Sequence, residues 1–102
     1  MKWVEIIKLR VAENTRESLL RRLTEHLADM NQAGGLTEIR LFHNAVVNSD
    51  LSIHLYWETA RIERQGSTPG LCLIHVFKAY GLISHSIWIE SAGGGNLELA
   101  LN

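Results

Sequence analysis

This sequence has a single cysteine, a net charge close to zero and no long hydrophobic run. Cys72 is the only cysteine in 102 residues, which excludes an internal disulfide and a zinc cluster built from cysteines. The formal net charge is -1, so electrostatics give no reason to expect nucleic acid or an anionic membrane as a partner. No segment approaches the roughly 20 consecutive apolar residues of a membrane helix.

The first residues also lack the features of a secretory signal. The segment Met1–Glu5 contains a glutamate and has no uninterrupted apolar stretch followed by a small-residue cleavage site. We therefore expect a cytoplasmic protein with neither a membrane nor a nucleic acid as its partner.

The length and composition fit one small domain. A chain of 102 residues with a hydrophobic fraction of 46% can bury one core and leaves little room for a second. We assign residues 1–91 to this domain and residues 92–102 to a glycine-rich hinge with a C-terminal arm. Leucines at positions 97, 99 and 101 alternate behind the glycines. This spacing favours a short strand or extended arm packed on the body of the protein, with disorder as the alternative.

Four segments have the composition and alternation of β-strands, namely residues 3–11, 36–45, 51–58 and 82–91. In the first segment Ile6 and Ile7 are adjacent, so both faces carry an apolar side chain, as in a central strand. The second and third segments flank Asn48, Ser49 and Asp50, which are residue types that favour a turn.

Two helices are expected between these strands. The first begins at Asn14, where Glu17 completes a capping-box spacing, and ends at the glycine pair 34–35. The second begins at Thr68, with Pro69 as its first helical residue, and ends before Gly81. The apolar side chains of the first helix form one stripe that consists of Leu19, Leu20, Leu23, Leu27 and Met30.

The resulting order, β-α-β-β-α-β, is the ferredoxin-like α+β arrangement, in which two helices cover one face of a four-stranded antiparallel sheet. The other face is bare in a monomer. Here it carries Phe42, Tyr56 and Trp88 among polar residues, which is more aromatic than a solvated surface requires. Packing two such sheets face to face would bury these rings, and we therefore expect a homodimer.

This order of elements, over residues 3–91, resembles the dimeric α/β-barrel proteins and, among them, the antibiotic biosynthesis monooxygenases. Trp57, at the end of the third strand, looks like the tryptophan often found there. The resemblance implies two sheets that close into a barrel around a small, often aromatic ligand, and a monooxygenase-like reaction without a cofactor. Residues 3–11 lack the asparagine that haem-degrading or quinone-forming relatives carry in the first strand, and residues 59–70 form a longer connection than usual.

The bare face of the sheet holds the strongest group of candidate site residues. Apolar walls with a few convergent polar groups are typical of small-molecule pockets. His54, beside Tyr56 and Arg40, is the one reasonable base, so these three are the candidate catalytic residues. The candidate ligand-binding residues are Phe42, Trp57, Ser84, Ser86 and Trp88. The alternative is a non-catalytic face that serves dimer assembly or ligand sensing.

A metal site between two histidines depends on the register of the strands that carry them. A turn on Asn48 and Ser49 alone would place His43 opposite His54, where two imidazoles would suit zinc or copper. The hydrophobic pattern instead favours a one-residue shift that separates them onto opposite faces. We therefore expect no metal.

Other reactive side chains have simpler explanations. His85 lies among isoleucines and is expected to be a hydrogen-bonded core histidine, and Cys72 an inert buried thiol. A haem-handling role for His75 is an open alternative. Residues 61–67 precede the second helix, whose N-terminus would attract an anion, although a solvated loop explains them as well.

Overall fold

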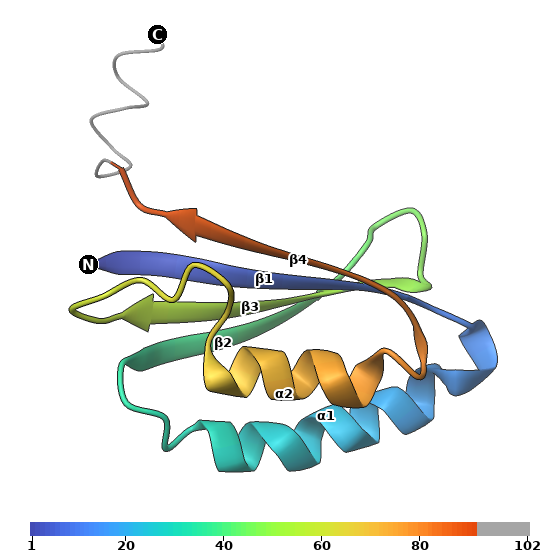
Figure 1. Ribbon diagram of the computed structural model, residues 1–102. Helices are drawn as coiled ribbons and strands as arrows, with labels where there is room; N and C mark the ends of the chain where they lie inside the picture. The colour runs from blue at the N-terminus through green and yellow to red at the C-terminus, as the bar shows by residue number, and fades with distance from the viewer. Residues whose placement is uncertain (92–102) are drawn as a thin grey trace, which may run out of the picture.

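The computed structural model describes residues 1–91 and places them in four strands and two helices (Figure 1). The C-terminal arm expected at residues 92–102 lies outside the described residues. The elements are β1 (Lys2–Val11), a short 3-10 turn (Glu13–Thr15), α1 (Arg16–Met30), β2 (Leu36–His43), β3 (Asp50–Glu58), α2 (Thr68–Phe77) and β4 (Gly81–Ile89).

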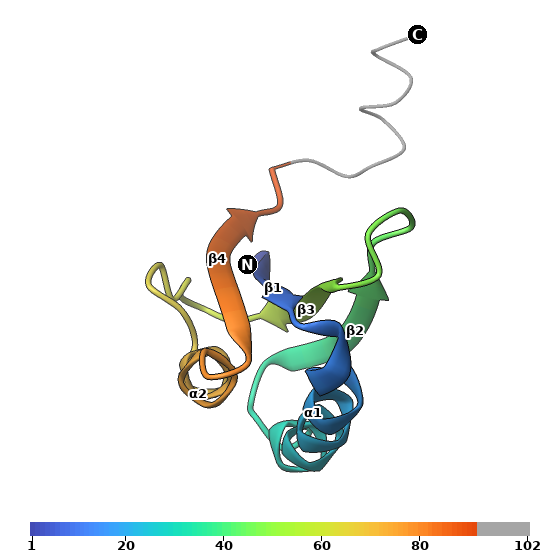
Figure 2. The same ribbon diagram turned by 90° about the vertical axis from the view of Figure 1, so that its right-hand side faces the viewer.

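The sheet has the order β2-β3-β1-β4, and all its neighbouring strands are antiparallel. Both helices lie on the same face of this sheet, and the opposite face, called the open face below, carries no helix (Figures 1 and 2). The ferredoxin-like β-α-β-β-α-β prediction is confirmed. β1 pairs with a strand on each side, as predicted for a central strand; its Ile7 is buried under the helices, whereas its Ile6 lies half-buried on the open face.

The core lies between the sheet and the helices. Alternation sends the odd-numbered residues of β1 and β3 into it and the even-numbered residues to the open face. The largest fully buried apolar side chains come from both layers, and they are Ile7, Leu19, Ile53, Leu55, Leu73 and Phe77. The positions of the open-face residues therefore follow from the same alternation that builds the core.

The register of the β2–β3 hairpin separates the two histidines as predicted from the hydrophobic pattern, but the predicted shift of one residue was wrong. His43 pairs with Leu51 and His54 pairs with Arg40, so the two histidines lie on opposite faces of the sheet. The shift from the register of a tight turn is three residues rather than one. The turn begins earlier than expected because the Asn44 side chain accepts hydrogen bonds from the backbone N–H groups of Val46 and Val47, at 2.8 and 2.9 Å.

Both predicted helix starts were wrong by one or two residues. α1 begins at Arg16, and its N-cap, Thr15, makes no capping bond because its hydroxyl donates to the carbonyl oxygen of Ala12. The N-cap of α2 is Ser67 rather than Thr68, and the Ser67 hydroxyl accepts from the N–H of Gly70. Neither helix in the described part of the chain is long and apolar enough to cross a membrane.

The prediction that Cys72 is buried was also wrong. Gly70, Leu73 and Phe77 form the buried side of α2, at a spacing of three and four residues. Cys72 lies on the other side of the helix and is exposed.

Candidate functional site

The open face is organised in rows of side chains that run across the sheet. Strand pairing places Arg40 beside His54, His54 beside Ile6, and Ile6 beside Ser86, in the order β2-β3-β1-β4. The row on one side of this central row contains Tyr56, Val4 and Trp88, and the row on the other side contains Phe42, Ser52, Lys8 and Ser84. The structure thus brings together seven of the eight predicted site residues on one surface.

His54 lies between two aromatic rings. The centre of its imidazole is 4.7 Å from the centre of the Phe42 ring and 6.3 Å from that of Tyr56. The guanidinium carbon of Arg40 is 6.0 Å from the centre of the Tyr56 ring, within the range of a cation–π contact. The three predicted catalytic residues are therefore neighbours in space.

The environment of His54 favours its neutral form. Burial lowers the pKa of His54 below its ordinary value of 6.5, and the positive charge of Lys8 lowers it further. The Nε2 atom of His54 lies 2.8 Å from the hydroxyl oxygen of Ser52. A neutral, oriented imidazole at neutral pH is able to accept a proton from a bound molecule.

Arg40 is held in place by a carboxylate on its own strand. Its Nε lies 2.6 Å from Glu38 Oε1, and this hydrogen bond and the charge of Glu38 raise the pKa of Arg40. Both side chains are exposed, so the pair stabilises the fold little. Its effect is to fix the guanidinium near Tyr56.

Two hollows flank the central row of the open face. One has a volume of about 430 Å³, and its lining includes Lys8, Phe42, Ser52 and Ser84. The other has a volume of about 500 Å³, and its lining includes Tyr56 and Trp88. Both volumes fall in the range of small-molecule sites.

Trp57 does not join the other predicted ligand-binding residues. It occupies an odd position of β3, so its side chain is buried on the helix side of the sheet, stacked on Trp3 with ring centres 5.5 Å apart. Its indole N–H donates to Glu5 Oε1 at 3.3 Å. Trp88, by contrast, donates to the Ser86 hydroxyl on the open face, at 2.9 Å.

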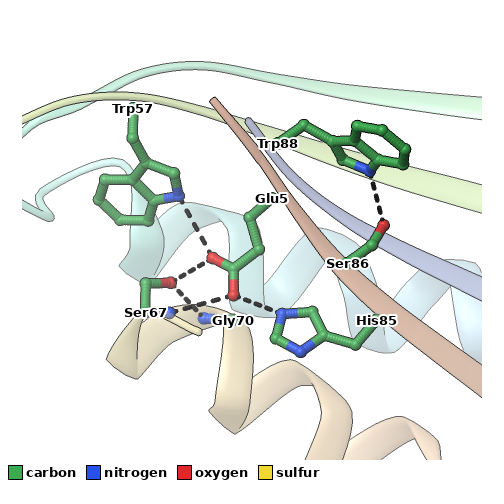
Figure 3. A network of polar contacts seen from close by, with 7 residues as sticks. All are labelled: Glu5, Trp57, Ser67, Gly70, His85, Ser86 and Trp88. Carbon is green, nitrogen blue, oxygen red and sulfur yellow. Dashed lines mark hydrogen bonds and ion pairs between the residues drawn. The ribbon is translucent and has the colours of Figure 1, made fainter. Parts of the chain in front are cut away.

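A buried network around Glu5 was not predicted from the sequence (Figure 3). The Glu5 side chain is fully buried, and its carboxylate accepts hydrogen bonds from Trp57 and from the backbone N–H and hydroxyl of Ser67, at 3.0 and 2.5 Å. His85 Nε2 lies 2.7 Å from Glu5 Oε2, so the predicted hydrogen-bonded histidine is confirmed. The signal in the sequence was one charged residue at a core-facing position of β1.

The Glu5 network ties the start of α2 to the sheet. The Ser67 hydroxyl donates to Glu5 and also accepts from the N–H of Gly70, so it caps α2 and connects it to β1. The backbone N–H of Ser67, a donor that a helix N-terminus would offer to a bound anion, is occupied by the chain's own carboxylate. The network is therefore complete without a ligand.

The comparisons with known proteins found matches among solved structures only. Neither a family model nor a curated protein matches the sequence. Rv0793 from Mycobacterium tuberculosis has a TM-score of 0.72 at 13% identity, over 93% of this chain and 100% of that one. A proposed antibiotic biosynthesis monooxygenase from Nitrosomonas europaea has a TM-score of 0.71 at 10% identity, over 92% of this chain and 94% of that one. SnoaB, a cofactor-independent oxygenase from Streptomyces nogalater, has a TM-score of 0.64 at 13% identity, over 92% of this chain and 97% of that one.

The chain has the fold of the antibiotic biosynthesis monooxygenases. At these identities the likeness establishes the architecture, and the chemistry has to be argued from the residues of the open face.

Proposed function

We propose that this chain is a cytoplasmic, homodimeric small-ligand protein that binds an aromatic or polycyclic compound on the open face and oxidises it without a cofactor. The observation that carries the proposal is the position of His54, a histidine with a lowered pKa that lies between Phe42, which lines one hollow, and Tyr56, which lines the other. Apolar walls with one base among them are what such a reaction requires.

In the proposed reaction His54 is the general base. It removes a proton from the ligand to form a carbanion or phenolate, and Arg40, held near Tyr56, stabilises the negative charge that develops. Dioxygen is the oxidant. One of its oxygen atoms replaces the two hydrogens of a ring carbon, and the other leaves as water with those hydrogens. The fold shared with SnoaB, described as a cofactor-independent oxygenase, supports this choice.

Phe42 and Trp88 supply the aromatic walls of the proposed site, and Ser84 and Ser86 supply hydroxyl groups. Trp57 contributes from the other side of the sheet, because it holds Glu5 and does not reach the open face. We therefore propose that Trp57 supports the site through Glu5 and does not contact the ligand.

A second copy of the chain would complete the site. Trp88 is 60% exposed and Leu82 is 74% exposed, although both are apolar and lie on the open face. The connection between β2 and β3 rises above the same face, and Val46 in this connection is 89% exposed (Figures 1 and 2). Packing two open faces together would remove these groups from water and enclose the ligand.

The same exposed side chains also favour a second candidate, a non-catalytic dimer that senses a ligand. The two candidates differ in one observable, because an enzyme consumes its ligand and dioxygen whereas a sensor returns the ligand unchanged.

A thermal-shift screen of aromatic and quinol compounds tests the proposal, since a ligand of the folded state raises the melting temperature. His54→Ala should weaken the shift or abolish turnover and leave the melting temperature of the free protein nearly unchanged. His75→Ala, which alters an exposed histidine of α2, is the matched control and should change neither. If no compound shifts wild type, or if His54→Ala binds and turns over ligand as wild type does, the proposal fails.

A further inference from the structure

The hollow around Lys8 has an arrangement that suits a negatively charged group. Lys8 on β1 pairs with Ser52 on β3 and with Ser84 on β4, and all three line the hollow. The side chain of Lys8 therefore leaves the sheet between those of two serines in a single row. Phe42 lines the same hollow.

Lys8 differs from the other cation of this hollow in its partners. Arg10 is occupied, because its guanidinium makes two bonds to the carboxylate of Asp50, at 2.9 and 3.2 Å. The ion pairs within residues 1–91 do not include Lys8. With Arg10 balanced by Asp50, the lining retains one uncompensated positive charge.

In the proposed dimer, the free-energy cost of the Lys8 charge would be higher than in the monomer. Packing a second sheet over the hollow would remove the Lys8 ammonium from water, and a buried charge without a counter-ion is strongly unfavourable. A ligand that carries its own negative charge would supply that counter-ion.

We infer that the hollow binds an aromatic carboxylic acid, whose carboxylate lies against Lys8 and the hydroxyls of Ser52 and Ser84 and whose ring lies against Phe42. This inference rests on the proposed function and names its class of ligand. The volume of about 430 Å³ suits a ligand with one or two rings. Ser52 also contacts His54, so the anchored ring is placed beside the proposed base.

The inference is tested by the affinities of 2-naphthoate and of its neutral analogue 2-naphthamide, measured by titration calorimetry. Wild type should bind the acid at least about tenfold more tightly than the amide. Lys8→Met should remove this preference and leave the affinity for the amide within about twofold. Lys2→Met, which removes a lysine from the same face of the same strand, should retain the preference.

A second readout follows His54 by NMR. Besides Lys8 on β1, the charged or titratable groups near His54 are Arg40 and its partner Glu38 on β2 and Tyr56 on β3, whereas its row and the next on β4 hold the serines 84 and 86. Bound naphthoate should raise the pKa of His54, because its charge cancels that of Lys8, and naphthamide should not.

The outcomes separate the two proposals. If acid and amide bind wild type and Lys8→Met equally, the open face binds aromatic compounds, but the inference about the carboxylate is wrong. If neither compound binds wild type, both the inference and the proposed function are contradicted.

Discussion

At the residue scale, the two histidines of the described strands β3 and β4 have opposite roles. His54 lies on the open face in a row with Arg40, whereas His85 lies on the helix side and contacts Glu5. Sequence alternation places them on these two faces, and it is the neighbours across the sheet that distinguish a candidate base from a structural group.

His54 makes stability depend on pH in a defined direction. Its pKa is lowered in the folded protein, so below its ordinary value of 6.5 the unfolded chain binds more protons than the folded one. The stability that His54 contributes should therefore be fully present above pH 6.5 and should be lost as the pH falls through the folded pKa of His54. Urea unfolding of wild type and His54→Gln between about pH 5 and about pH 8 measures this term. Identical pH profiles for the two proteins would contradict it.

Removing the Glu5 carboxylate should lower the free energy of unfolding far more than replacing His54. Glu5→Ala leaves the indole of Trp57 and the N–H and hydroxyl of Ser67 without their buried acceptor, and we expect a loss of about 3–5 kcal/mol in unfolding free energy. The melting temperature should fall by more than about 10 °C. Glu90→Ala, at an exposed carboxylate, should stay within about 0.5 kcal/mol of wild type. A Glu5→Ala protein as stable as Glu90→Ala would show that the network contributes little.

At the element scale, periodicity was sufficient to predict every strand and helix in order, and even the faces of the β2–β3 hairpin. It failed where one side chain decides a boundary, as at Asn44, Thr15 and Ser67. The Glu5 network was out of reach for a related reason. The partners of Glu5 are separated from it by 52, 62 and 80 residues, and no local pattern connects them.

The connection to α2 depends on Gly66. Its φ is +113°, and a Cβ placed there would lie 2.6 Å from Cε1 of His85. Gly66→Ala should therefore destabilise the protein by about 1–3 kcal/mol, measured by urea unfolding. Gly34→Ala is the matched control, because a Cβ at Gly34 meets nothing within 4 Å, and it should be nearly neutral. Equal stability of the two variants would refute the close packing of this connection against His85.

At the scale of the whole molecule, the two faces of the sheet are unequal. The helix side is filled, and no buried side-chain nitrogen or oxygen in the described part of the chain lacks a hydrogen bond. The open face keeps Phe42, Leu82 and Trp88 exposed and contains both hollows described above. This asymmetry is the reason for proposing both a partner and a ligand on that face.

The dimer should depend on the open face alone. We expect sedimentation equilibrium to show a dimer with a total interface above roughly 1,200 Å² of buried surface. Trp88→Asp should raise the dimer dissociation constant about 30-fold or more, since buried tryptophans dominate interface energies. Leu71→Glu, at an exposed apolar residue of α2, should leave it unchanged. A monomer at micromolar concentration, or a dimer broken by Leu71→Glu instead, would disprove this assembly.

A nitrogen–proton NMR spectrum provides the most direct test of the claim that the ligand binds on the open face. The indole N–H groups of Trp3 and Trp57, whose partners are Thr59 and Glu5, report on the helix side of the sheet. The backbone N–H groups of Ser52 and Ser84 report on the hollow around Lys8. Titration with 2-naphthoate should shift the signals of Ser52 and Ser84 and leave those of Trp3 and Trp57 nearly in place. Shifts at Trp3 and Trp57 with Ser52 and Ser84 unmoved would place the ligand between the sheet and the helices and contradict the account.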